Sequence, residues 1–391
     1  MKDRSKIIRI VNDLARALIV KRNSLCFCGS TSKFKKCCGS LNNMDLTFID
    51  NLTFLEEALE TAKAYALSQG RPITGIPAGI WRQAETASLN RLICLYPGCT
   101  NKPINCHLTP RNVLRSSFGG HCKEYTLVGL EPQFGKVGIN KAGCLPVFCA
   151  DHDDRIFKRV DTLRIDRNSK EHMFLLGLKA IAFSLRRTQY YLGIDSQVAI
   201  FGALGGLSER NHIDISIDHL QDQYVRFIVT YNFFQECVFA YAASDFDFFV
   251  SLYRSMPYKD LMFASTFTTI PYDLEGQKIN QPAEVAVAIA CNIFTIDNQL
   301  HVIYSCPRGN SATFHQNFLR QLGEVDDDEF IIILNNILTL RVEAALMPVS
   351  FSPSEDDLRK INAAGQFAKQ SMQPGGPAFD LKNTSRAIKF I

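Results

Sequence analysis

Apolar residues recur at helical spacing along much of the chain. Between residues 5 and 22, Ile7, Val11, Leu14 and Leu18 return every three or four positions among charged residues, which predicts one amphipathic helix. The same spacing predicts further helices, and an acidic run at Asp326–Glu329 suits the start of the last one because negative charge is favourable at a helix N-terminus. These helices are expected over 45–69 (closed by Gly70), 170–195, 208–255 and 327–346.

After residue 261 the pattern changes to that of strands. Three runs rich in β-branched and aromatic residues follow one another, FASTFTTIP, VAVAIACNIFTI and LHVIYSCP. Asp297 and Asn298 separate the last two runs, and such a two-residue turn between β-branched segments predicts a hairpin. The fold class is therefore expected to be α+β.

The chain has 391 residues, more than one hydrophobic core normally serves. We expect a basic helix and a small cysteine module at 1–42, a helix and a Pro/Gly-rich linker at 43–79, and a second cysteine-rich domain at 80–165. A mixed helical and β-hairpin domain should occupy 166–370, followed by a flexible tail at 371–391.

Charge is distributed unevenly. Residues 1–36 carry ten Lys and Arg against two Asp, and residues 82–160 carry eleven against six Asp and Glu, although the whole chain is only +4. A basic front half indicates a polyanionic partner, which makes nucleic acid the expected ligand. The basic N-terminal helix is interrupted by Asp13, Arg16 and Lys21, unlike a signal peptide, and no run of 18 apolar residues occurs. We expect a cytoplasmic protein without a membrane span.

The first cysteine group is CFCGSTSKFKKCCG, in which Cys26, Cys28, Cys37 and Cys38 form two close pairs. Thirteen cysteines in a long chain without a leader indicate metal ligands more than disulfides. Four thiolates satisfy tetrahedral zinc, and a segment this short has almost no core, so metal would supply its folding energy.

This segment resembles the SEC-C motif, a small zinc module of many bacterial proteins. The resemblance is carried by the four cysteines together with Gly29, Ser30, Lys35, Lys36 and Gly39. It implies a docking module for protein or nucleic acid.

The second group contains Cys94 and Cys99, spaced as a zinc knuckle, and Cys149 and His152 just before a helical stretch. A knuckle followed by a helix N-terminus is the layout of a treble-clef zinc site, so these four residues are the expected ligands of a second structural zinc ion.

Between these pairs, Cys106-His107-Leu108-Thr109-Pro110 resembles the start of the metal-dependent core of HNH endonucleases. The resemblance implies that His107 is the general base, Asn140 orients it, and Asp153 helps to hold Mg²⁺ or Mn²⁺. Cys106 departs from the family pattern, which has an acid or a histidine there. His107 could instead be a zinc ligand, and Arg111 and Arg115 are either phosphate contacts or an exposed helix face.

The leading hypothesis is a zinc-binding protein that acts on nucleic acid, with nuclease activity as its enzymatic form. Proteins of this build resemble parts of bacterial anti-phage defence systems. The alternative is a non-catalytic, zinc-stabilised adaptor that binds a partner protein through its C-terminal domain. The sequence contains no phosphate-binding Gly-rich loop, no Gly-x-Ser-x-Gly and no dinucleotide fingerprint, which argues against nucleotide hydrolysis and serine-hydrolase chemistry.

Overall fold

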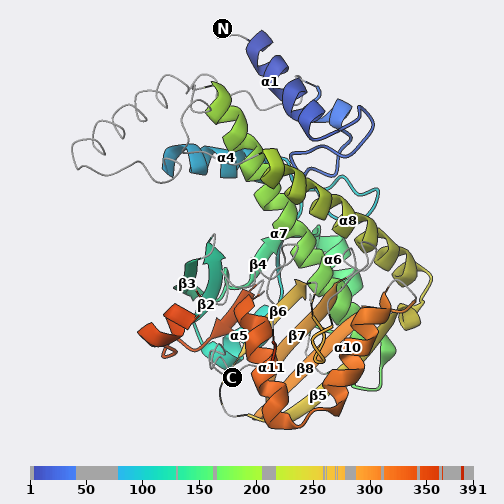
Figure 1. Cartoon of the computed structure of the whole chain (residues 1–391), viewed down its shortest axis with the longest axis vertical. Helices are drawn as coiled ribbons and strands as arrows, with labels where there is room; N and C mark the ends of the chain where they lie inside the picture. The colour runs from blue at the N-terminus through green and yellow to red at the C-terminus, as the bar shows by residue number, and fades with distance from the viewer. Residues whose placement is uncertain are drawn as a thin grey trace. The chain divides into compact units, whose positions relative to one another are not determined.

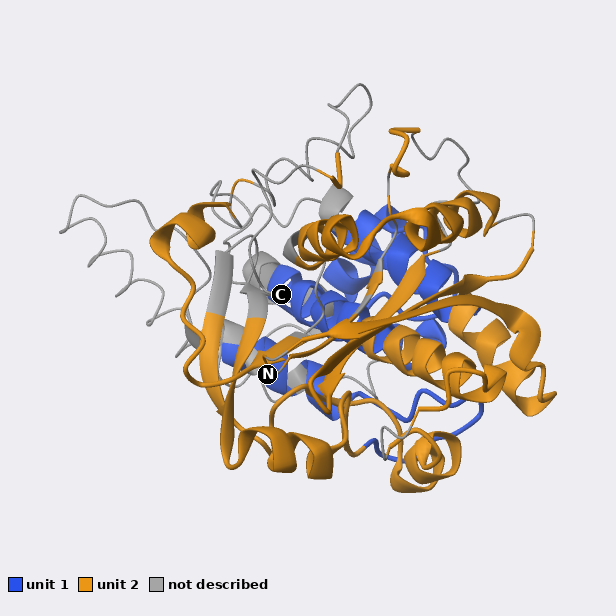
Figure 2. Cartoon of the chain, turned by 90° about the horizontal axis from the view of Figure 1, so that it is seen from below, with its two compact units in different colours: residues 1–103, 185–232 blue, residues 104–184, 233–391 orange. Residues whose placement is uncertain are grey.

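The computed structural model describes residues 4–40, 78–128, 131–161, 165–204, 217–258, 260, 262–268, 270, 272–277, 288–309, 312–340, 344–360, 363 and 380–382. The helix expected over 45–69, most of the linker and most of the tail lie outside these residues. By contacts the chain divides into two compact units (Figure 2). Unit 1 comprises Met1–Pro103 and Leu185–Asn232, and unit 2 comprises Ile104–Ser184 and Phe233–Ile391.

Unit 1 is helical around the first cysteine group. Its described elements are α1 (Arg4–Ala17), the short helix η1 (Phe34–Lys36), α4 (Ala78–Asn90), and the parts of α7 (Lys170–Leu204) and α8 (Ile217–Ala242) that fall within it. The amphipathic prediction for α1 is confirmed, because Val11 and Leu14 are buried whereas Arg9 and Arg16 are exposed. The helix ends at Ala17 and not at residue 22, since Ile19 adopts a left-handed backbone (φ 55°).

Unit 2 contains a seven-stranded antiparallel sheet with the order β3-β2-β9-β6-β7-β8-β5 among its described residues (Figure 1). Its strands are β2 (His121–Val128), β3 (Glu131–Gly138), β5 (Phe249–Pro257), β6 (Phe263–Thr268), β7 (Ile289–Ile296), β8 (Gln299–Pro307) and β9 (Ala344–Met347). The α+β fold class is confirmed.

Helices cover both faces of this sheet. Alternate residues of β8, among them Leu300, Val302 and Tyr304, form one core cluster with residues of α10 (Thr313–Glu324) and α11 (Asp327–Leu340). On the opposite face the first half of α7 lies against the strands: the Asn292 side chain donates to the Leu176 carbonyl at 3.2 Å. Gly177 allows this close approach, because a Cβ there would lie 3.3 Å from the Phe249 ring.

The predicted hairpin between β7 and β8 is confirmed. Asp297 and Asn298 both have positive φ, 53° and 58°, which is the backbone of a two-residue type I′ turn.

Two helix predictions extend too far. Helix α8 ends at Ala242, and Phe249–Pro257 forms the edge strand β5, paired along its whole length with β8. Helix α11 ends at Leu340, and Ala344–Met347 forms β9 between β2 and β6. In both segments pairing with a distant strand satisfies the backbone groups, and local periodicity carries no information about that pairing.

A smaller structure in unit 2 carries the sequence Cys106-His107. Strand β1 (Asn105–His107) pairs antiparallel with β4 (Cys144–Pro146), with His107 opposite Cys144, and α6 (Ala150–Phe157) follows β4. Helix α5 (Arg111–Phe118) and the β2–β3 hairpin lie between the two short strands in the sequence. No described helix combines the length and apolar character needed to cross a bilayer.

Candidate metal centres

The backbone around the first cysteine group is a pair of tight turns. Gly29 takes a positive φ of 80°, and its amide donates to the Cys26 carbonyl at 3.2 Å, so the chain reverses directly after Cys28. The helix η1 ends at Lys36, and Cys37 and Cys38 follow it. An L side chain at position 29 would be strained in this conformation, which explains the glycine.

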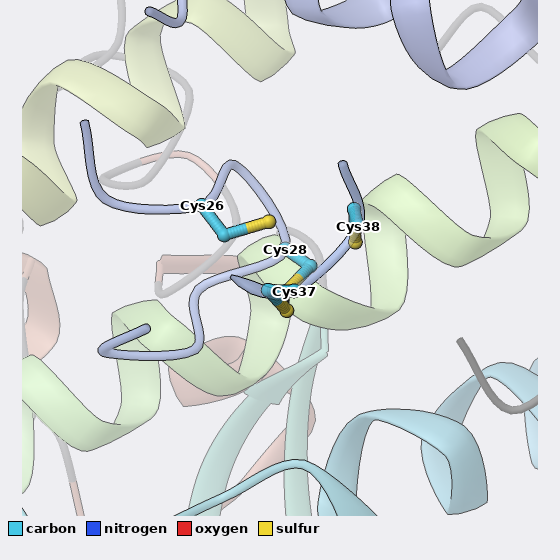
Figure 3. Close-up of side chains that lie close together, drawn as sticks. All are labelled: Cys26, Cys28, Cys37 and Cys38. Carbon is cyan, nitrogen blue, oxygen red and sulfur yellow. Dashed lines mark hydrogen bonds between the residues drawn. The ribbon is translucent and has the colours of Figure 1, made fainter. Parts of the chain in front are cut away.

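This backbone brings the four sulfur atoms together (Figure 3). All lie within 4.8 Å of one another, and Cys28 Sγ is 3.4 Å from Cys37 Sγ. Tetrahedral zinc with bonds of about 2.3 Å holds its ligands about 3.8 Å apart, so the spacing fits. All four residues are buried and none forms a disulfide.

Burial and neighbouring thiols shift the pKa values of the four cysteines. Burial raises the pKa of Cys26, whereas hydrogen bonds from Cys26 and the neighbouring thiols lower the pKa of Cys28. The Ser30 hydroxyl donates to Cys37 Sγ at 2.9 Å, which favours the thiolate form. A buried group of this kind is suited to a divalent cation, which replaces the protons and offsets the thiolate charge.

The cysteine loop is held within unit 1 by the helices. Ser196 on α7 donates to the Phe27 carbonyl at 3.1 Å, and Tyr224 on α8 donates to the Leu25 carbonyl at 3.0 Å. Arg91, directly after α4, donates from Nη1 to Cys38 Sγ at 3.4 Å. Sequence reasoning missed Arg91, because 53 residues separate it from Cys38.

The outer side of α1 and of the cysteine loop is basic. Its exposed side chains are Arg9, Arg16, Lys21, Arg22, Lys33 and Lys36, a set that we call the basic face. Within it, Arg16 pairs with Asp13 at 3.2 Å. The charge predicted from the sequence is thus displayed at the surface of unit 1.

The second group contains the four residues expected as ligands. Gly98 has a positive φ of 79° in the knuckle, and the Cys94 amide donates to the Asn101 carbonyl at 2.9 Å. Cys149 is the residue before α6, and its Sγ is 3.2 Å from His152 Nδ1 in the first turn. The ligand atoms of Cys94, Cys99, Cys149 and His152 all lie within 4.8 Å of one another, so this group could also hold zinc.

His107 belongs to neither group of close ligand atoms among the described residues. Its Nε2 lies 3.3 Å from the Ile139 carbonyl oxygen. Burial lowers the pKa of His107, so the ring is neutral near pH 7. A carbonyl only accepts hydrogen bonds, so Nε2 carries the proton and Nδ1 keeps a lone pair that can accept one.

Asp153 lies near His107 and has an unusual environment. Its Oδ1 is buried without a hydrogen-bond partner, and each of the two residues affects the pKa of the other. Burial raises the pKa of Asp153, and the charge of Lys179 acts in the opposite direction. Asn140, the third residue expected here, is exposed and directly follows Ile139.

Cys106 is a structural thiol. It is 1% exposed, its Sγ accepts the Phe148 amide at 3.3 Å, and burial raises its pKa to about 12. Cys106 belongs to neither group of close ligand atoms among the described residues, so the departure from the HNH pattern at this position removes one candidate ligand and adds none.

Lys179 is a second residue that sequence reasoning missed. It is 4% exposed on α7, pairs with Asp161 at 2.7 Å, and lies 5.2 Å from the centre of the Phe157 ring. A single lysine within the apolar run FLLGLKAIAFS is the signal that could have indicated it.

Comparison with known proteins supports the assignment of the first cysteine group to the SEC-C motif. The family model of the SEC-C motif matches residues 22–40, which include all four cysteines. No curated protein and no solved structure matches the chain. The motif is zinc-associated, and the clustered sulfur atoms are compatible with zinc binding.

Proposed function

We propose that this protein binds nucleic acid and hydrolyses phosphodiester bonds at His107 and Asp153, on a scaffold that two structural zinc ions stabilise. The observation that carries the proposal is a neutral imidazole, whose Nδ1 is able to accept a proton, close enough to affect the pKa of a carboxyl group whose Oδ1 is buried without a hydrogen-bond partner. Perturbed titratable groups brought together in this way are typical of catalytic sites.

The roles follow from the chemistry of the side chains. His107 Nδ1 accepts a proton from the attacking water, while the Ile139 carbonyl holds the ring in the required tautomer. Asp153 offers an oxygen ligand, the donor type that Mg²⁺ and Mn²⁺ prefer. A divalent ion bound there would stabilise the negative charge that develops on the phosphate.

Binding of the polyanion is assigned to the basic face of unit 1 and to the exposed Arg111 and Arg115 of α5. Lys and Arg that neutralise phosphates release counterions, so affinity should fall steeply as salt rises. Replacing Lys33 and Lys36 by Gln should weaken binding of a DNA or RNA duplex and reduce the slope of log affinity against log salt by about 2. An unchanged slope would remove the basic face from the proposal.

The test of catalysis compares the parent with His107→Ala and Asp153→Asn on DNA and on RNA, with Mg²⁺ or Mn²⁺. Loss of a general base typically costs 10²–10⁴-fold in rate. His121→Ala is the matched control, because His121 is an exposed histidine of the same unit. Cleavage that survives in His107→Ala, or is absent from a zinc-loaded parent, would contradict the proposal.

A non-catalytic adaptor is the second candidate, and the SEC-C match favours it because that motif implies docking. Phe239 on α8 is 64% exposed and offers an apolar contact for a partner protein. An inactive but folded and zinc-loaded parent, with a protein partner lost on Phe239→Ser, would support the adaptor.

A further inference from the structure

Arg91 places a cation beside the first cysteine group from outside the motif. Its Nη1 donates to Cys38 Sγ at 3.4 Å, whereas Nε and Nη2 are buried without a hydrogen-bond partner. No carboxylate pairs with Arg91 within the described part of the chain. The anionic partner that Arg91 contacts is therefore the cysteine group, through Cys38 Sγ.

A guanidinium removed from water is costly unless an anion accompanies it. Neutral thiols are weak acceptors and would leave Arg91 uncompensated. Four thiolates around one divalent zinc carry a net charge of −2, so one buried guanidinium halves that charge.

We infer that Arg91 is the positioning residue and counter-charge of the first zinc centre. It offsets the excess negative charge of the four thiolates and orients Cys38 through the N–H···S contact. Partners in the outer shell of metal sites act in this way, and their loss typically weakens metal binding 10–100-fold. Because Arg91 directly follows α4, the same contact links α4 to the cysteine loop. This inference rests on the proposal that the first group binds zinc.

The test uses Arg91→Met and Arg91→Lys in the full chain, with Arg82→Met as control. Arg82 is an exposed arginine of α4, the helix that Arg91 follows, so its loss removes an equal charge away from the sulfur atoms. Zinc affinity is measured by competition with a chelator, and the first centre is identified as the metal lost in Cys26→Ser. Substitution by cobalt gives a sulfur-to-metal charge-transfer band that reports on the geometry of the thiolates.

Arg91→Met should weaken zinc binding at the first centre 10–100-fold and alter the cobalt band, with Arg82→Met unchanged. Arg91→Lys keeps the charge but loses the planar donor group, and should lie between the parent and Arg91→Met. Equal affinity in the parent and Arg91→Met would overturn the inference, as would a lysine variant as weak as the methionine variant if both fold. Zinc content that is the same in the parent and Cys26→Ser would instead contradict the zinc centre itself.

Discussion

Substitution of Gly193 by Ala tests how α7, α4 and the cysteine loop meet within unit 1. A Cβ at Gly193 would lie 2.2 Å from Ser88 Oγ and 2.8 Å from the Cys28 carbonyl oxygen. The serine hydroxyl can rotate away, because its hydrogen bond to the Tyr190 carbonyl is long at 3.4 Å. The Cys28 carbonyl belongs to the tight turn between the ligands and has much less freedom.

The change in unfolding free energy caused by Gly193→Ala is the sum of two opposed contributions. In an open helix, Gly→Ala stabilises by about 1 kcal/mol, because alanine loses less backbone entropy. Overpacking of a close contact costs about 1–3 kcal/mol. The contact to the Cys28 oxygen is about 0.6 Å shorter than the 3.4 Å at which ordinary contacts begin, so we place the overpacking cost at the upper end. The expected net effect is a loss of about 1–2 kcal/mol of unfolding free energy.

Urea unfolding followed by circular dichroism and by the fluorescence of Trp81, the only tryptophan, measures this loss. Gly323→Ala in α10 is the matched control, since the nearest atom to its Cβ would be Leu252 Cδ1 at 3.8 Å. That variant should be as stable as the parent or up to about 1 kcal/mol more stable. A Gly193→Ala protein at least as stable as Gly323→Ala would refute the close packing of helix and loop.

Three further outcomes are expected. Cys149→Ser and Cys26→Ser should each lower zinc from two ions to one per chain by elemental analysis, whereas Cys237→Ser, a buried cysteine outside both groups, should leave it at two. Burial lowers the pKa of His315 to about 4 from 6.5, so the unfolded chain binds a proton there first and stability falls as pH drops from 6.5 to 4. This loss of stability is about 3 kcal/mol at most. His315→Leu should abolish this contribution to the pH dependence of the unfolding midpoint, measured from pH 8 to pH 4. The same pH dependence in the parent and in the variant would count against the buried histidine. The charge of Lys179 lowers the pKa of Asp153. If the proposed catalysis holds, Lys179→Met should therefore move the acid limb of the pH–rate profile of cleavage to higher pH. An identical pH–rate profile would show that Lys179 does not influence the site.

The sequence was most informative where structure is local. Four ligands within thirteen residues, with Gly29 where a positive φ is needed, define the first centre because few residues of chain lie between them. The Asp297-Asn298 turn was predictable for the same reason: its backbone conformation depends on two residues and their immediate neighbours. The spacing of Cys94, Cys99, Cys149 and His152 also indicated the second group that the structure brings together.

What remained hidden depends on contacts between distant segments. The sequence by itself determined the α+β class, the SEC-C segment and the two sets of candidate zinc ligands. Only the tertiary structure decided that β9 joins β2 to β6, that Arg91 faces Cys38, and that burial keeps Cys106 protonated and His107 neutral. The reason is physical: turn geometry and ligand spacing are properties of short stretches of chain, whereas desolvation, strand partners and buried counter-charges are set by residues far away in the sequence.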